Sequence, residues 1–154
     1  MQEIIDIHSK GDYPANVLSN FYPRDNFVFR GVKIASAEGF LQSLKFKNPK
    51  NQIKICALVG KEAKKKGKRK FLWKITGNVY WKGEKWKRRD ERSFMFLIYS
   101  FYIEMYNQDI VFAKALNSTG NAKLIHSIGK HDKRKTILTE EEFIKTLEQL
   151  RAFC

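Results

Sequence analysis

The apolar spacing between about Asp90 and Tyr106 constrains the fold of this chain more than any other stretch of its sequence. Large apolar side chains recur there every three or four residues, which is the repeat of a helix with one buried face. They are Phe94, Leu97, Ile98, Phe101 and Met105. The longest apolar run of the chain, SFMFLIYSFYI at 93–103, is much shorter than the roughly 20 residues that a membrane-spanning helix needs, and charged residues flank it. We therefore expect a globular protein whose core includes this helix.

Other segments also carry helix signals. Ser36 is a good N-cap for a helix that continues to about residue 46, and Pro49 disfavours helix at the residue before it. Thr139 and Glu142 have the spacing of a capping box, which marks the start of a last helix. Shorter helices are expected at 52–59, 61–66 and 109–116.

Two segments near the N-terminus favour strands. Residues 3–8, EIIDIH, alternate loosely, and residues 27–36 hold β-favouring side chains on both sides of Arg30-Gly31, which predicts a hairpin. Strands and helices do not alternate along the chain, so a doubly wound fold is not expected. No linker or fixed-period repeat divides the 154 residues. The sequence therefore predicts a single compact domain over 1–154, α+β and mainly helical, with a small antiparallel β element near the N-terminus.

The chain is strongly basic. Thirty Lys and Arg against sixteen Asp and Glu give a formal net charge of +14. The excess is concentrated at 61–70 and 82–92, and clusters of this kind favour binding to DNA, RNA or phosphorylated metabolites. A general role in solubility is the alternative explanation.

Several classes of function are not indicated. The sequence holds no dinucleotide-binding glycine motif, P-loop, nucleophile elbow or zinc-protease motif. Its three His and two Cys have no metal-ligand spacing, so no metal site is predicted. The first residues, MQEIIDIHSK, lack the basic-then-apolar pattern of a signal peptide. We therefore expect an intracellular, cytoplasmic protein without membrane association.

Glu38, Gln42 and Lys45 form a polar row on the helix predicted after Ser36. Spacings of four and seven residues place the three side chains within an arc of about 60°. The apolar side chains of the same helix occupy a different arc, which should face the core. An ordinary solvated face and the wall of a cleft would both produce this pattern.

Five runs of the sequence match those of a known family. They are LSNFYP at 18–23, SAEGFLQSLKF at 36–46, VYW at 79–81, STGNAKLIHSIGKHDKRKT at 118–136 and LTEEEF at 138–143. On these runs, which appear in family order, the chain resembles the NADAR family, also called YbiA-like proteins. The resemblance implies a mainly helical fold and hydrolysis of N-glycosidic bonds without a metal or organic cofactor. It implies as substrate either phosphorylated ribosides of the riboflavin pathway or ADP-ribose on guanine bases in nucleic acid.

The resemblance also places Glu38, Gln42 and Lys45 in the active site. A carboxylate at Glu38 would stabilise the positive charge that builds on the sugar as its C1–N bond breaks, or would activate the attacking water. Lys45 would adjust the local charge balance, hold a phosphate, or attack the opened ribose as a Schiff base. The sequence leaves these roles of Lys45 open.

Further residues are expected to bind the substrate. Asn20 and Phe21 would form the wall opposite the helix. Trp81 and Trp73 would stack on a base, with a buried core position as the alternative for both. In the fourth family run, the backbone amides of the turn at Gly129 and the charge of Lys130 suit the binding of a diphosphate. Asp132 is expected to bind the ribose or to order the loop. The expected residues of this run are Ser127, Gly129, Lys130 and Asp132.

The sequence is therefore interpreted as an N-glycosidase. Its charge favours ADP-ribose attached to a nucleic-acid base as the substrate, with DNA or RNA contacting the basic stretches 61–70 and 82–92. A hydrolase of phosphorylated riboflavin-pathway intermediates is the alternative within the enzyme class. A module that binds ADP-ribose or single-stranded nucleic acid without cleaving it is the rival from another class.

Overall fold

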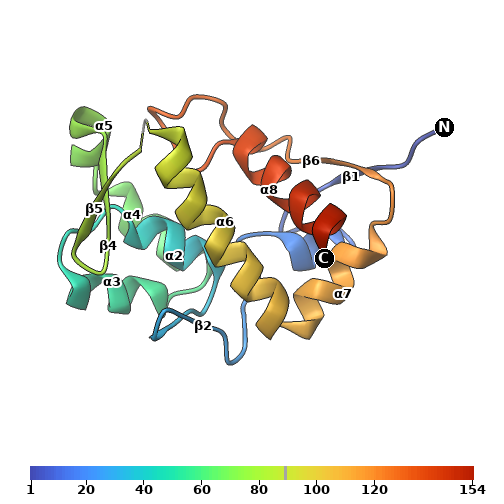
Figure 1. The fold of residues 1–154 in the computed structure, drawn as a ribbon, viewed down its shortest axis with the longest axis horizontal. Helices are drawn as coiled ribbons and strands as arrows, with labels where there is room; N and C mark the ends of the chain where they lie inside the picture. The colour runs from blue at the N-terminus through green and yellow to red at the C-terminus, as the bar shows by residue number, and fades with distance from the viewer. Residues whose placement is uncertain (89) are drawn as a thin grey trace.

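A long helix crosses the middle of the molecule. The computed structural model describes residues 1–88 and 90–154. Figure 1 shows α6, Glu91–Gln108, running between α2, Ala37–Ser43, on one side and α8, Glu140–Phe153, on the other. The predicted apolar face of α6 is fully buried, as expected. The mainly helical α+β class is confirmed, and none of the described helices is both long and apolar enough to cross a bilayer.

Aromatic rings join α6 to the first half of the chain. Phe101 of α6 stacks on Phe40 of α2, with ring centroids 4.0 Å apart. Phe29 and Trp81 pack against the same Phe40 ring at centroid distances of 5.4 and 5.1 Å. Each such pair contributes about 0.5–1.5 kcal/mol beyond the area that it buries. The cluster fixes α2 against α6 and leaves the polar row of α2 on another side of the helix.

The three shorter helices expected from the sequence are present with similar bounds, whereas the short helices α1 and α5 were not expected. α3 begins at Pro49 rather than at residue 52, because Asn48 caps it and proline is favoured in the first turn. The capping box of Thr139 and Glu142 is present at the start of α8. The bounds are α1 Ala15–Leu18, α3 Pro49–Cys56, α4 Gly60–Lys68, α5 Leu72–Thr76 and α7 Ile110–Ser118.

Two antiparallel hairpins are present. β2 (Val28–Phe29) and β3 (Val32–Lys33) form the hairpin predicted near the N-terminus. Arg30 and Gly31 between them both have positive φ, as a type I′ turn requires. The second hairpin joins β4 (Asn78–Trp81) to β5 (Glu84–Lys87).

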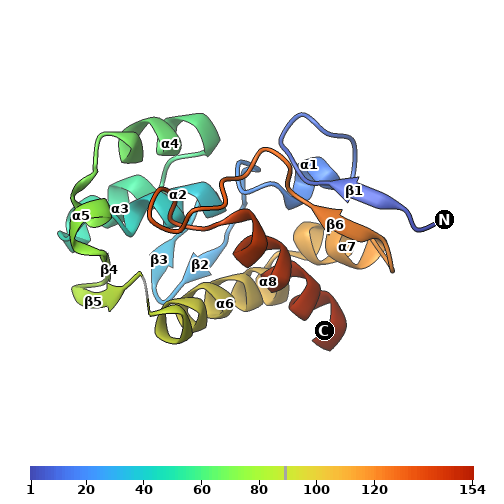
Figure 2. The same cartoon turned by 90° about the horizontal axis from the view of Figure 1, so that it is seen from above.

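The strand expected near the N-terminus is also present. β1, Ile4–Asp6, pairs in parallel with β6, Lys123–Ile125, and Figure 2 shows the two side by side. β6 is a short strand within residues 118–136, a segment whose turn residues Gly120 and Gly129 favour loops. The pairing holds the segment that connects β6 to α8 against the start of the chain.

Close packing places α3 and α4 directly on α2. Ser36 is the predicted N-cap: its Oγ accepts a hydrogen bond of 3.1 Å from Gly39 N and donates one of 2.9 Å to Leu58 O. A β-carbon at position 39 would lie 2.8 Å from the Leu58 carbonyl oxygen and 2.9 Å from that of Ile55. Only glycine permits this approach, which brings the C-terminal end of α3 onto α2.

Candidate active site

A cavity of about 440 Å³ opens beside the polar row of α2. It is lined by α2 and α4 together with segments from residues 19–21 and 126–138. In Figure 2 the connection between β6 and α8 lies in front of α2, and residues of both segments line the cavity. The volume lies in the usual range of small-molecule sites, about 300 to 1,000 Å³. The expected site residues that line it are Asn20, Phe21, Glu38, Gln42, Lys45, Gly129 and Lys130.

Among the described residues that line this cavity, Glu38 supplies the only carboxylate. Its Oε1 accepts a hydrogen bond of 2.7 Å from Gln42 Nε2, and its backbone N–H donates to Asn20 O at 2.9 Å. Burial raises the pKa of Glu38, whereas the hydrogen bond from Gln42 and the charges of Lys64 and Lys45 oppose that rise. Glu38 is thus a carboxyl group withdrawn from bulk water and surrounded by cations.

Lys45 lies just beyond the end of α2, seven residues after Glu38. Its Nζ donates to Gly67 O at 3.3 Å and lies 5.5 Å from the ring centroid of Trp73. Burial lowers the pKa of Lys45 to about 8, and the charge of Glu38 opposes this change. At that pKa the amine exchanges its proton just above neutral pH, which suits a lysine that acts as nucleophile or proton carrier.

Asn20 and Phe21 form a wall of the cavity. The hydroxyl of Tyr102, which is buried, donates a hydrogen bond of 2.5 Å to Asn20 Oδ1. The amide oxygen of Asn20 is therefore occupied, and its NH₂ group is the end that remains to bind a ligand. The Phe21 ring packs on Gly60, where a β-carbon would lie 3.2 Å from the ring.

His126 also lines the cavity, and sequence reasoning did not select it. Its Nδ1 lies 2.6 Å from the carbonyl oxygen of Ile7, which can only accept, so Nδ1 carries the proton of the neutral ring. Nε2 then has a lone pair, and within residues 1–88 and 90–154 it has no hydrogen-bond partner. Gly129 packs on the same ring, because a β-carbon there would lie 2.6 Å from His126 Cδ2.

Lysine is the most frequent residue type in the cavity wall. Seven lysines line it: Lys45, Lys64, Lys68, Lys70, Lys74, Lys130 and Lys135. Three come from the basic stretch 61–70, which the sequence assigned to nucleic-acid binding. An excess of cations around one carboxylate attracts a ligand with several negative charges, such as a diphosphate.

The two tryptophans do not line the cavity. Trp81 is 2% exposed and packs among Phe29 and Phe40, so the expectation that it stacks on a substrate base is wrong. Trp73 is equally buried, and Lys45 and Lys74 lie over its ring. Trp73 therefore supports two lysines of the cavity instead of contacting a ligand directly.

Ser127 and Asp132 are not among the residues that line the cavity. Ser127 donates to Asp6 through both its backbone N–H and its hydroxyl, and these hydrogen bonds lower the pKa of Asp6. Asp132 accepts hydrogen bonds from the backbone and side chain of Arg134. The expected contact of Ser127 with a diphosphate is not seen, because Ser127 bonds Asp6 instead. For Asp132, which was expected either to bind the ribose or to order the loop, the hydrogen bonds to Arg134 favour the ordering of the loop.

The second basic stretch, 82–92, lies on the β4–β5 hairpin and the start of α6. Arg88 is 1% exposed and forms an ion pair of 2.6 Å with Glu142, so it is not available to nucleic acid. Lys82 Nζ donates to Arg30 O at 2.7 Å. Arg89 lies outside the described residues.

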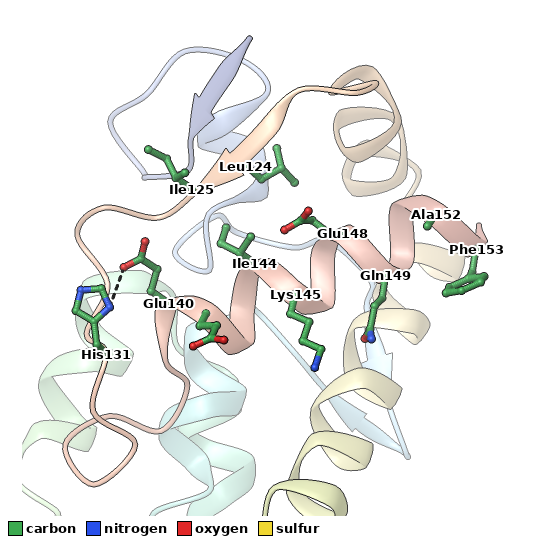
Figure 3. Close-up of a pocket in the computed structure, with 11 residues that line it drawn as sticks. Leu124, Ile125, His131, Glu140, Ile144, Lys145, Glu148, Gln149, Ala152 and Phe153 are labelled. Atoms are coloured by element: carbon green, nitrogen blue, oxygen red, sulfur yellow. Dashed lines mark ion pairs between the residues drawn. The ribbon is translucent and has the colours of Figure 1, made fainter. Parts of the chain in front are cut away.

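A larger and more open cavity, of about 730 Å³, lies along α8. Figure 3 shows its Glu140 paired with His131, at 3.3 Å, and Glu148 further along the helix. Its glutamates would repel a phosphorylated ligand, and none of the expected site residues lines it. No group of three His, Cys, Asp or Glu side chains in the described part of the chain is arranged to hold a metal ion.

The chain is similar in sequence to a described protein family and to a phage protein. Residues 12–152 match the family described as Bacteriophage protein GP30.3. The chain is 35% identical over 150 residues to an uncharacterized 17.1 kDa protein of Enterobacteria phage T4, from the Gp30-rIII intergenic region, and the match covers 96% of each chain. The fold is similar to the NMR structure of E. coli YbiA, with a TM-score of 0.64 and 20% identity over 99% of this chain and 85% of YbiA. The expected YbiA-like architecture is confirmed.

Proposed function

This chain belongs to the family described as Bacteriophage protein GP30.3, and we propose that it is an N-glycosidase that removes ADP-ribose from a guanine base in nucleic acid. The observation that carries the proposal is the position of Glu38, a half-buried carboxylate in a cavity that is also lined by seven lysines. A carboxylate beside several lysines suits the cleavage of the C1–N bond in a phosphorylated riboside. The sugar becomes positive as the bond breaks, while its phosphates remain negative.

Glu38 stabilises the sugar in this mechanism. As the C1–N bond breaks, its electron pair leaves with the base, and positive charge spreads over C1 and the ring oxygen. An ionised Glu38 beside these atoms lowers the barrier, and Lys45 and Lys64 favour the ionised form of that carboxyl. Gln42 fixes the carboxylate through its hydrogen bond of 2.7 Å.

His126 completes the reaction with water. The oxygen of a water molecule bonds to C1 and transfers a proton to Nε2 of His126, while the departing base takes up a proton from solvent. His126 then releases its proton to solvent, which restores the free enzyme. The hydrogen bond between His126 Nδ1 and Ile7 O presents Nε2 as the basic nitrogen. The products are free ADP-ribose and the unmodified base.

The distribution of lysines supports a nucleic-acid substrate. Lys64 and Lys68 of α4 line the cavity, while Lys61, Lys65 and Lys66 of the same helix are exposed outside it. The positive surface therefore continues beyond the volume that a single ADP-ribose would fill. A polyanionic strand would bind this surface through its phosphates and release counterions.

The test compares the wild-type protein with Glu38→Gln on two substrates. These are a DNA oligonucleotide with ADP-ribosylated guanine and a phosphorylated riboside of the riboflavin pathway, with released sugar measured by mass spectrometry. We expect release from the oligonucleotide and a loss of about 10² to 10⁴-fold in kcat for the variant, with substrate affinity retained. Turnover of the riboside alone would establish the metabolic alternative. Binding without turnover of either substrate would establish a non-catalytic module.

A further inference from the structure

An exposed apolar face is formed by the short helix α5 and by Phe71, the N-cap residue just before it. Phe71, Leu72 and Ile75 are 64%, 66% and 68% exposed. Spacings of three and four residues place Leu72 and Phe71 beside Ile75 on one side of the helix, while Trp73 on another side is buried. Apolar side chains this exposed are unusual when they gather in one patch, and such patches mark interaction sites.

Two lysines connect this patch to the cavity. Lys70 directly precedes Phe71, Lys74 directly precedes Ile75, and both lysines line the cavity. The Nζ of Lys74 lies 6.0 Å from the centroid of the Trp73 ring, which anchors it at the rim. The apolar patch and the cavity wall are therefore joined through two residues that adjoin the patch in the sequence.

The charge of the surroundings restricts the partner. No Asp or Glu occurs between Glu62 and Glu84, and eight Lys or Arg residues occupy 64–74 and 82. A partner on this face must therefore combine negative charge with flat or apolar groups. Unpaired nucleotides have both, since every base offers a π-face and every linkage carries a phosphate.

We propose that Phe71, Leu72 and Ile75 form a platform on which unpaired bases flanking the modified nucleotide stack, while Lys70 and Lys74 bind the phosphates between them. The proposal rests on the proposed function and defines its substrate as single-stranded. A modified base can enter the cavity only when it is not stacked in a duplex, and extrusion from a duplex costs energy. Contacts to neighbouring bases are available only when those bases are unpaired, so they favour a single-stranded substrate. Phosphate contacts do not, because both single and double strands carry phosphates.

The test measures binding of an unmodified, fluorescein-labelled single-stranded DNA of about 12 nucleotides by anisotropy. Phe71→Ala should weaken binding about 10-fold, the usual effect of losing one stacked base. Phe96→Ala is the matched control, because Phe96 is 66% exposed but lies on α6; it should change affinity less than twofold. Phe71→Ala should leave the salt dependence of binding unchanged, because it removes no charge.

Two further measurements separate the competing explanations. Binding to vesicles of phosphatidylserine and phosphatidylcholine tests whether the face contacts lipid. Loss of vesicle binding in Phe71→Ala with unchanged DNA binding would overturn the proposal, as would equal DNA affinities of Phe71→Ala and Phe96→Ala. Hydrolysis of ADP-ribosylated guanosine should have the same KM in Phe71→Ala and wild type, while KM for the oligonucleotide rises. Phe71-dependent DNA binding without hydrolysis would support the platform and contradict the proposed function.

Discussion

Gly67 of α4 packs directly against the side-chain amide of Gln42 in α2, and a β-carbon at position 67 would overlap the amide oxygen of Gln42. The carbonyl oxygen of the same glycine accepts the hydrogen bond from Lys45 Nζ. Two side chains of the candidate site therefore depend on one close approach between neighbouring helices. Gln42 in turn holds Glu38, so this approach also determines where the carboxylate lies.

Gly67→Ala should lower activity far more than stability. The added methyl group displaces Gln42 and with it the partner of Glu38, so we expect kcat for N-glycoside hydrolysis to fall at least about 10-fold. Overpacking costs about 1–3 kcal/mol, which the higher helix propensity of alanine offsets by about 1 kcal/mol. Steady-state kinetics and thermal unfolding measure both effects. Lys66→Ala, at the exposed neighbouring position, is the control, and full activity of Gly67→Ala would contradict the expected role of this contact.

Glu38→Gln should stabilise the fold at neutral pH while it removes activity. Burial raises the pKa of Glu38, so the folded state holds this proton more tightly than the unfolded state. The contribution of Glu38 to stability is therefore complete below its unfolded pKa and is lost as the pH rises through its folded pKa. An amide has no such loss, and we expect about 0.5 to 2 kcal/mol of added stability at pH 7.

Chemical denaturation at pH 4 and pH 7 checks this expectation. The difference between Glu38→Gln and wild type should grow with pH between these values. Glu148→Gln serves as the control, because Glu148 is exposed on α8 and should show no such growth. A variant that is less stable than wild type at pH 7 would show that the Glu38 carboxylate is favoured by its surroundings and not strained by burial.

The polar row of α2 could be predicted from the sequence because local geometry determines it. A helix fixes the relative directions of residues four and seven positions apart, and Ser36 fixes where this helix begins. His126 could not be found in the same way. It reaches the cavity because β6 pairs with β1, and that parallel pairing joins segments about 120 residues apart without a local signal.

The burial of Trp81 could not be predicted from its local sequence. The alternation of β4 places Val79 and Trp81 on one face of the strand, but alternation does not reveal whether that face meets the core or a ligand. Phe29 and Phe40, which come from distant segments, cover Trp81 and decide the outcome. The role of the basic stretch 61–70 could not be predicted for the same reason. Its helical spacing places Lys64 and Lys68 on one face, but it does not show that α2 lies beside that face.

Lys45 should give the reaction an alkaline limit. Because the pKa of Lys45 is about 8, the amine loses its charge above that pH and no longer favours an ionised Glu38 or binds a phosphate. We expect kcat/KM to fall above about pH 8 in the wild type. In Lys45→Arg the fall should move to higher pH, because a guanidinium stays charged. Lys66→Arg, at the exposed position on α4, should keep the wild-type profile.

The covalent route through Lys45 predicts the reverse. A Schiff base requires the neutral amine, so activity would rise through pH 8, Lys45→Arg would be inactive at every pH, and borohydride would trap the sugar on the protein. The pH profiles of the two proteins, together with mass spectrometry after borohydride treatment, distinguish the two roles.

His126→Ala should lose activity and regain it when imidazole is supplied. Removal of Nε2 takes away the group that accepts the proton of the attacking water, so we expect kcat to fall about 100-fold or more with KM little changed. Added imidazole can occupy the space of the missing ring beside Gly129 and accept the same proton. Rescue that depends on imidazole concentration, measured with the ADP-ribosylated oligonucleotide, supports the proton transfer. A purely structural role, through the Ile7 hydrogen bond and the Phe143 ring contact, would lower thermal stability and would give no rescue.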